Sequence, residues 1–280
     1  MKTASEGHCQ LDHNVLKQLT EELKFAASHM DGKEWRALLA AALAKSARET
    51  CRSKYEGLKG LGRLGRDGWR KIRTDGLAET GRELTARAKE ALDSLPHRAK
   101  ETVLRLYQLS PAELCDELVP FIIGLIVCYA SAGGLDLEGG LPDTDLELGI
   151  GMHRNIFSHS VFIGFTCEGV LRFGVEVLSG LHGKLPAEHH AVWDNAHRHI
   201  KKCESSAITG LWVGICLHFI KDAGLFSHAT KPYTGLPGQH NMAFHQGLLA
   251  GNGAASGVTG TSQAFSGKSG HLRKGSSGEA

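Results

Sequence analysis

Aspartate and histidine residues gather in two short stretches of the chain and together could bind a metal ion. The stretches are LPDTDLELGIGMHRNIFSHS, over 141–160, and GICLHFIKDAGLFSH, over 214–228. The six candidate ligands are Asp143, Asp145, His153, His159, His218 and Asp222. His218 and Asp222 are four positions apart, so on a helix both side chains project from one face. Buried carboxylates and imidazoles need a partner, and a divalent ion is one that both can share.

The mixture of ligand types indicates which metals to expect. Imidazole and carboxylate together suit Zn²⁺, Mn²⁺ or Fe²⁺ better than Ca²⁺, which prefers oxygen alone. We expect Zn²⁺ first, with Mn²⁺ and Fe²⁺ as alternatives. Six candidates exceed the three or four protein ligands of one zinc ion, so a two-metal centre is also open.

Neighbouring residues could bind or activate a substrate. Arg154 follows a candidate ligand and could clamp a phosphate, or it could form a salt bridge to one of the aspartates. Asp143, Asp145 and Arg154 are the catalytic candidates, because a carboxylate left free of the metal could serve as a general base. The segment FSHATKPYTGLP adds possible pocket residues, which are His228, Lys231 and Tyr233.

The order of these motifs resembles the predicted membrane-associated, metal-dependent hydrolases of the YdjM-like group, which carry P-D-x-D, H-R-G-x-T-H-S and H-x-x-x-D segments. The matching residues are Pro142, Asp143, Asp145, His153, Arg154, Ser158, His159, Ser160, His218 and Asp222. The resemblance covers about 118–237 and implies metal-assisted hydrolysis near a membrane. The apolar H-x-x-x-D segment alone is weakly similar to the helical zinc phospholipase C and nuclease group.

The elements that must position these residues are mostly helices. Apolar residues recur at helical spacing over 10–50 and again over 77–92, and strand-like alternation is rare. The sequence therefore predicts an all-α helical bundle, with a buried apolar core helix and a metal site between helices. We expect a partly basic helical region over 1–110 and a hydrolase-like helical domain over 111–248. Within the first region, the glycine- and arginine-rich residues 57–76 suggest a flexible connector.

Two further segments affect topology. Residues 118–135 are eighteen positions without a charge, which is near the lower limit for a membrane-spanning helix. Their glycines, serine and Pro120 also suit a central buried helix, which is the interpretation we favour. The Gly/Ser-rich residues 249–280 are expected to form a disordered tail.

Composition and charge limit the cellular setting. The formal net charge is only +2, which does not require nucleic acid as a partner, although residues 45–105 hold sixteen basic and nine acidic side chains. The seven cysteines form no C-x-x-C pair, and the first residues lack the apolar run of a secretory signal. We expect a cytoplasmic protein, associated in one interpretation with the inner face of a membrane.

The histidines of AEHHAVWDNAHRHIKK lie in a charged segment that is expected to be a solvent-facing helix. They are His189, His190, His197 and His199. His190 and His197 share a helical face with Asp194, a spacing that could bind a metal adventitiously.

These features favour a metal-dependent hydrolase of phosphoester bonds, acting on a phospholipid at a membrane surface or on another phosphoester. One alternative is a membrane-binding or pore-forming helical effector whose metal site is structural. Another is a metal-dependent nuclease, in which the basic segment holds the nucleic acid backbone.

Overall fold

The computed structural model describes residues 13–149, 154–225 and 229–272, and in these residues all regular structure is helical. The all-α prediction is confirmed. The elements are α1 (His13–Ser28), α2 (Gly32–Asp75), α3 (Leu77–Tyr107), α4 (Pro111–Ala132), the short 3₁₀ helix η1 (Pro142–Leu148), α5 (Val161–His182), α6 (Val192–Asp222) and α7 (Met242–Leu272).

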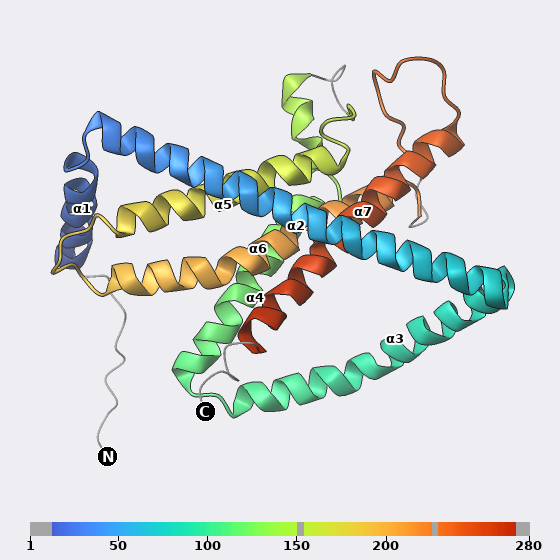
Figure 1. Cartoon of the computed structure of the whole chain (residues 1–280), viewed down its shortest axis with the longest axis horizontal. Coiled ribbons are helices and arrows are strands. Elements are labelled where there is room, and N and C mark those ends of the chain that lie inside the picture. Colours follow the sequence, from blue (N-terminus) through green and yellow to red (C-terminus); the bar gives the residue numbers. More distant parts are fainter. Residues whose placement is uncertain (1–12, 150–153, 226–228, 273–280) are drawn as a thin grey trace.

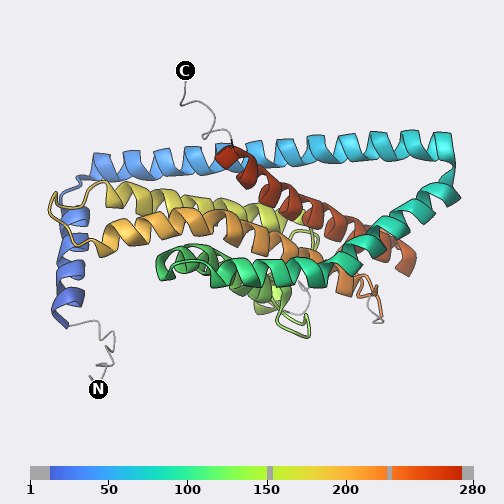
Figure 2. The same ribbon diagram turned by 90° about the horizontal axis from the view of Figure 1, so that it is seen from below.

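The core helix of the bundle is α6. It packs against α4, α5 and α7, while α2 lies across α5 and α7 on the side away from α4 (Figures 1 and 2). Trp212, Ile215 and Phe219 of α6 are fully buried. They lie within a helix that is apolar on several faces, and neighbours on those faces remove them from water.

Residues 118–135, the segment expected to be the buried core helix, instead lie at the edge of the bundle. Most of them belong to α4, where Phe121 is 65% exposed and Leu125 is 57% exposed. The prediction was wrong because α4 packs through its small residues and directs its large ones outward. Among the described residues, α4 and α6 are long and apolar enough to cross a membrane, and α6 is half buried inside the bundle.

The α4–α6 contact brings two backbones together. A Cβ atom added at Gly210 would lie 2.0 Å from the carbonyl oxygen of Gly124, and one at Gly214 would lie 2.4 Å from that of Cys128. Glycine is required at both positions because a backbone carbonyl inside a packed helix cannot move aside cheaply.

Gly210→Ala is therefore expected to destabilise the protein by about 1–3 kcal/mol, the usual effect of overpacking a core. Gly169→Ala on α5 is the matched control, because its added Cβ would have no described atom within 4 Å beyond its chain neighbours and the backbone of its own helix. The control should be neutral or should stabilise the helix by up to about 1 kcal/mol. Urea denaturation of both variants measures the difference, and equal stabilities would contradict the close helix approach.

Two glycine-rich segments that were expected to be irregular are helical. Residues 57–76 are not a flexible connector, since α2 continues without a break to Asp75 and ends at Gly76, whose φ of 84° suits glycine. α2 begins in a capping box formed by Asp31 and Glu34, and its 44 residues span about 66 Å. It forms a long arm with α3, which turns back from its far end (Figure 1).

The segment expected to be a disordered tail from 249 onward is helical as far as Leu272, within α7. Gly253, Gly257 and Gly260 lie on one face of this helix. A Cβ at each would lie 3.0–3.1 Å from a side chain of α6. The low-complexity composition thus provides a narrow helix face for close packing, and residues 249–272 continue the helix that begins at Met242 instead of forming a disordered tail.

Candidate metal centre

Four of the six predicted ligands meet in one buried cluster. Asp143 lies in the first turn of η1, His159 lies two residues before α5, and His218 and Asp222 lie on the last turns of α6. A ligand atom from each residue can be chosen so that all four atoms lie within 4.8 Å of one another. This group could hold a metal ion.

The separations between the ligand atoms match those around a single small ion. His159 Nε2 lies 3.1 Å from Asp143 Oδ1 and 3.7 Å from Asp222 Oδ2. His218 Nε2 lies 3.5 Å from Asp222 Oδ2 and 3.8 Å from Asp143 Oδ2. Two atoms bound tetrahedrally to one zinc ion at 2.0–2.1 Å are themselves about 3.3 Å apart.

Each imidazole ring has a hydrogen-bonding partner on the side away from the candidate metal position. His218 Nδ1 lies 3.1 Å from the carbonyl oxygen of Ala132, which can only accept a hydrogen bond. Nδ1 therefore donates a hydrogen to this carbonyl, so Nε2 is the ring nitrogen that faces the two carboxylates. His159 Nδ1 lies 3.0 Å from Ser158 Oγ, on the side of the ring away from the cluster. Such contacts orient imidazole ligands in metal sites.

Several buried atoms of the cluster lack hydrogen bonds. Among the described residues, none forms a hydrogen bond to His218 Nε2 or to either carboxylate oxygen of Asp222, although Lys231 and Arg154 form longer ion pairs with this carboxylate. The side chains of His218 and Asp222 are 0% exposed. An unsatisfied buried polar atom costs free energy, about 1–3 kcal/mol and more for a charged group. A divalent ion would satisfy all of these atoms at once, so the residues present fit a metal.

Electrostatics keeps the carboxylates in the form that binds metal. Burial alone would raise the pKa of Asp222, but the facing His218, Lys231 and Arg154 outweigh it and lower the pKa to about 2. For Asp143, burial also opposes ionisation, while His159 and His218 lower the pKa below its usual value. Both carboxylates are thus anionic at neutral pH, as metal ligands must be.

Asp145, a fifth predicted ligand, is not part of the four-atom group. Its Oδ2 accepts hydrogen bonds from Ser158 Oγ and, at 3.2 Å, from Asn155 Nδ2. The same oxygen lies 3.6 Å from His159 Nδ1, behind the imidazole. Asp145 therefore supports a ligand rather than joining the group. Residues two apart in η1 face different sides of the His159 ring, so the structure brings Asp143 but not Asp145 into the group.

Arg154 and Lys231 lie beside the cluster, as expected for residues near a substrate. Arg154 Nε lies 3.6 Å from Asp222 Oδ2, and Lys231 Nζ lies 3.3 Å from Asp222 Oδ1 and 2.8 Å from a carboxylate oxygen of Glu138. Both side chains are about one fifth exposed. Arg154 thus forms a salt bridge to an aspartate, which was one of its two expected roles. The charge of Arg154 also lies close to the candidate metal position.

Tyr233 positions the site rather than lining an open pocket. It is buried, and its hydroxyl donates to the backbone carbonyl oxygen of His159. The backbone N–H of Gly139 also donates to Asp143 Oδ2, at 3.0 Å. Sequence reasoning missed Gly139 and the Ala132 carbonyl because backbone partners have no side-chain signature.

The two remaining predicted site residues, His153 and His228, lie outside the residues that the structure describes. The described part of the chain thus supplies four converging ligand atoms, enough for one ion. No family model, curated protein or solved structure matches this chain. The likeness to YdjM-like hydrolases stays a prediction that rests on the motifs alone.

Proposed function

We propose that this chain is a metal-dependent hydrolase of phosphoester bonds, with Asp143, His159, His218 and Asp222 as metal ligands. The observation that carries the proposal is the group of buried atoms without hydrogen bonds, His218 Nε2 and the two oxygens of Asp222, among the residues described. Two imidazole nitrogens and two carboxylates favour Zn²⁺, with Mn²⁺ or Fe²⁺ as alternatives.

The residues around the cluster suit hydrolysis of an anionic substrate. A bound divalent ion supplies Lewis acidity and lowers the pKa of a water molecule toward neutrality. Arg154 and Lys231 place two positive charges beside Asp222, where a phosphate group would form charge-assisted hydrogen bonds. Asp145 and Ser158 hold the His159 ring in its orientation.

A phospholipid is the substrate we favour, because apolar side chains near His159 are exposed and line a groove behind that ligand. The groove has a volume of about 430 Å³ and lies on the Asp145 side of His159. Its lining residues are Thr144, Asp145, Asn155, Phe157, Ser158, Phe162, Ile163 and Thr166. Phe157 and Phe162 are exposed and could contact an acyl chain.

The test combines metal analysis with a substrate screen. The purified protein should retain a divalent metal and hydrolyse a phospholipid in preference to a generic phosphodiester or DNA, and chelation should abolish the activity. Preferential cleavage of DNA would favour the nuclease alternative. A folded, metal-bound protein without activity on all three substrates would favour a structural metal site.

Membrane contact has separate support from α4. Phe121, Ile122, Leu125, Ile126 and Tyr129 are large apolar residues of this helix, and all are exposed. Contiguous exposed apolar surface of this kind marks an interaction site. We propose that this face contacts the cytoplasmic leaflet of a membrane.

The double variant Ile122→Glu/Ile126→Glu is expected to lower binding to anionic phospholipid vesicles more than tenfold. Each buried isoleucine contributes about 1.5–3 kcal/mol, and 1.4 kcal/mol is a factor of ten in affinity. Val103→Glu/Tyr107→Glu, also one helical turn apart and exposed on α3, is the control and should bind normally. Equal flotation of both variants with vesicles would exclude the α4 face.

A further inference from the structure

A second group of metal-binding side chains lies at the other end of the α5–α6 pair. His182 is the last residue of α5, His189 lies in the connection between the two helices, and Asp194 lies in the first turn of α6. The 22 residues of α5 place this end about 33 Å from the buried centre. We propose that these three residues bind a second divalent transition-metal ion, which fastens the α5–α6 connection.

The three side chains converge on one position. Asp194 Oδ1 lies 2.9 Å from His182 Nε2 and 3.1 Å from His189 Nε2. One ligand atom from each residue can be chosen within 4.8 Å of the other two. Two imidazole nitrogens and a carboxylate oxygen, from three different local elements, are the ligand set of many Zn²⁺, Ni²⁺ and Cu²⁺ sites.

His189 is oriented for coordination in the same way as His218. Its Nδ1 lies 2.8 Å from the carbonyl oxygen of Pro186, which only accepts, so Nδ1 donates there and Nε2 is the ring nitrogen that faces Asp194, to which it is hydrogen-bonded. This is the backbone–imidazole contact that commonly orients a metal-bound histidine. His190, which the sequence placed on a face with Asp194, is used elsewhere, since its Nδ1 accepts from the backbone N–H of Val192 at 3.2 Å.

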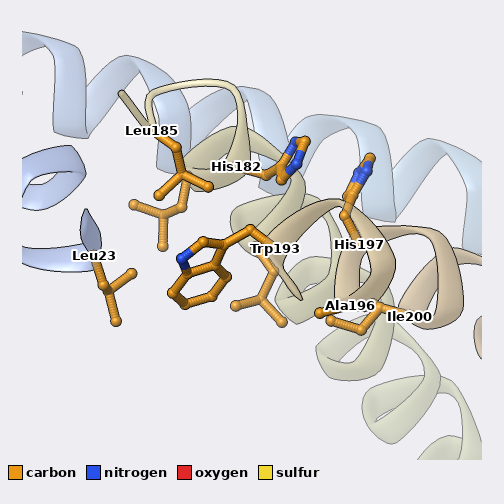
Figure 3. Close-up of a pocket in the computed structure, with 9 residues that line it drawn as sticks. Leu23, His182, Leu185, Trp193, Ala196, His197 and Ile200 are labelled. Carbon is orange, nitrogen blue, oxygen red and sulfur yellow. The ribbon is translucent and has the colours of Figure 1, made fainter. Parts of the chain in front are cut away.

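The surroundings hold the ligands in place and keep water from one side. Figure 3 shows His182 and His197 beside a small cavity of about 50 Å³ whose other walls are apolar, including Leu185 and Trp193. The His182 and His197 rings stack with centroids 4.4 Å apart and an interplanar angle of 9°. His197 thus fixes the plane of a proposed ligand.

The connection itself is anchored to α1. Glu22 accepts hydrogen bonds of 2.9 Å from the backbone N–H of His190 and from Trp193 Nε1. The turn that carries His189 is therefore ordered before any ion binds, which reduces the entropy lost on coordination. An ion bound to His182, His189 and Asp194 would cross-link the two ends of the segment 183–191.

The experiment separates the two sites. After chelation and dialysis, the wild-type protein should bind two equivalents of Zn²⁺ by titration calorimetry. His189→Gln and Asp222→Asn should each bind one equivalent, and His199→Gln, which changes a histidine of α6 outside the group, should still bind two. If His189→Gln binds as many equivalents of Zn²⁺ as the wild type, the second site is overturned. The same holds if only Asp222→Asn loses an equivalent.

Limited proteolysis gives a local measurement. Lys184 lies in the closed segment and is partly exposed, so trypsin can cleave after it when the segment opens. Zn²⁺ should slow this cleavage at least tenfold in the wild type and in Asp222→Asn, but not in His189→Gln. Cleavage that is insensitive to Zn²⁺ in the wild type would show that His182, His189 and Asp194 form only a hydrogen-bonded ion pair. If the buried centre binds no metal, zinc protection at Lys184 still reports on this site.

Discussion

Asp222→Asn is expected to empty the buried metal centre. The change keeps the volume of the side chain but removes a charge at a position where no described residue forms a hydrogen bond to either oxygen. Because the substitution removes a ligand rather than a residue behind one, the affinity for Zn²⁺ should fall by more than the roughly 10–100-fold typical of lost supporting contacts. Metal analysis and a competition titration with a chelator measure the loss.

Asp145→Asn tests a residue that contacts a metal ligand without belonging to the four-atom group. Asp145 lies 3.6 Å from His159 Nδ1 and outside the four-atom group, so its loss should weaken Zn²⁺ binding by about 10–100-fold. Asp116→Asn removes an exposed carboxylate paired with Lys202 and should leave metal content unchanged. If Asp145→Asn loses as much Zn²⁺ affinity as Asp222→Asn, Asp145 is itself a metal ligand. Full metal occupancy in Asp222→Asn would exclude the buried metal site.

Glu168→Gln should cause the largest loss of folding stability, by about 3–5 kcal/mol, because it removes one partner of a buried ion pair. Glu168 of α5 is 0% exposed and accepts hydrogen bonds from Lys54 of α2, from Trp212 Nε1 of α6 at 2.6 Å and from Arg172 Nε at 3.0 Å. Burial lowers the pKa of Lys54, and Glu168 opposes that shift, so the ammonium depends on this carboxylate.

Guanidinium chloride denaturation measures the effect on the free energy of unfolding. Glu117→Gln, which removes the exposed partner of Arg105, is the control and should cost about 0–1 kcal/mol. The double variant Lys54→Met/Glu168→Gln should recover part of the loss, since it no longer buries an unpaired ammonium. A loss below about 1 kcal/mol in Glu168→Gln would mean that this network does not join α2 to the bundle.

The metal site shows which of its features could be predicted from the spacing of residues along the chain. His218 and Asp222 were predicted on one helix face from their four-residue spacing, and their nearest ligand atoms lie 3.5 Å apart. Asp143 and His159 join them from separate segments, a meeting that the motif order suggested but that no periodicity requires. Asp145 lies at the other ring nitrogen of His159 from Asp143, because the path of η1 decides which side of that ring each carboxylate faces.

The sequence by itself determined the all-α class and the ligand pair on α6, because these depend on interactions within a few residues of the chain. Only the tertiary structure decided that α6 rather than α4 is the core helix and that the glycines of α7 form a packing face. It also brought His182 and His189 to Asp194. Burial and convergence depend on which surfaces of distant segments meet, and hydropathy along the chain does not encode that choice.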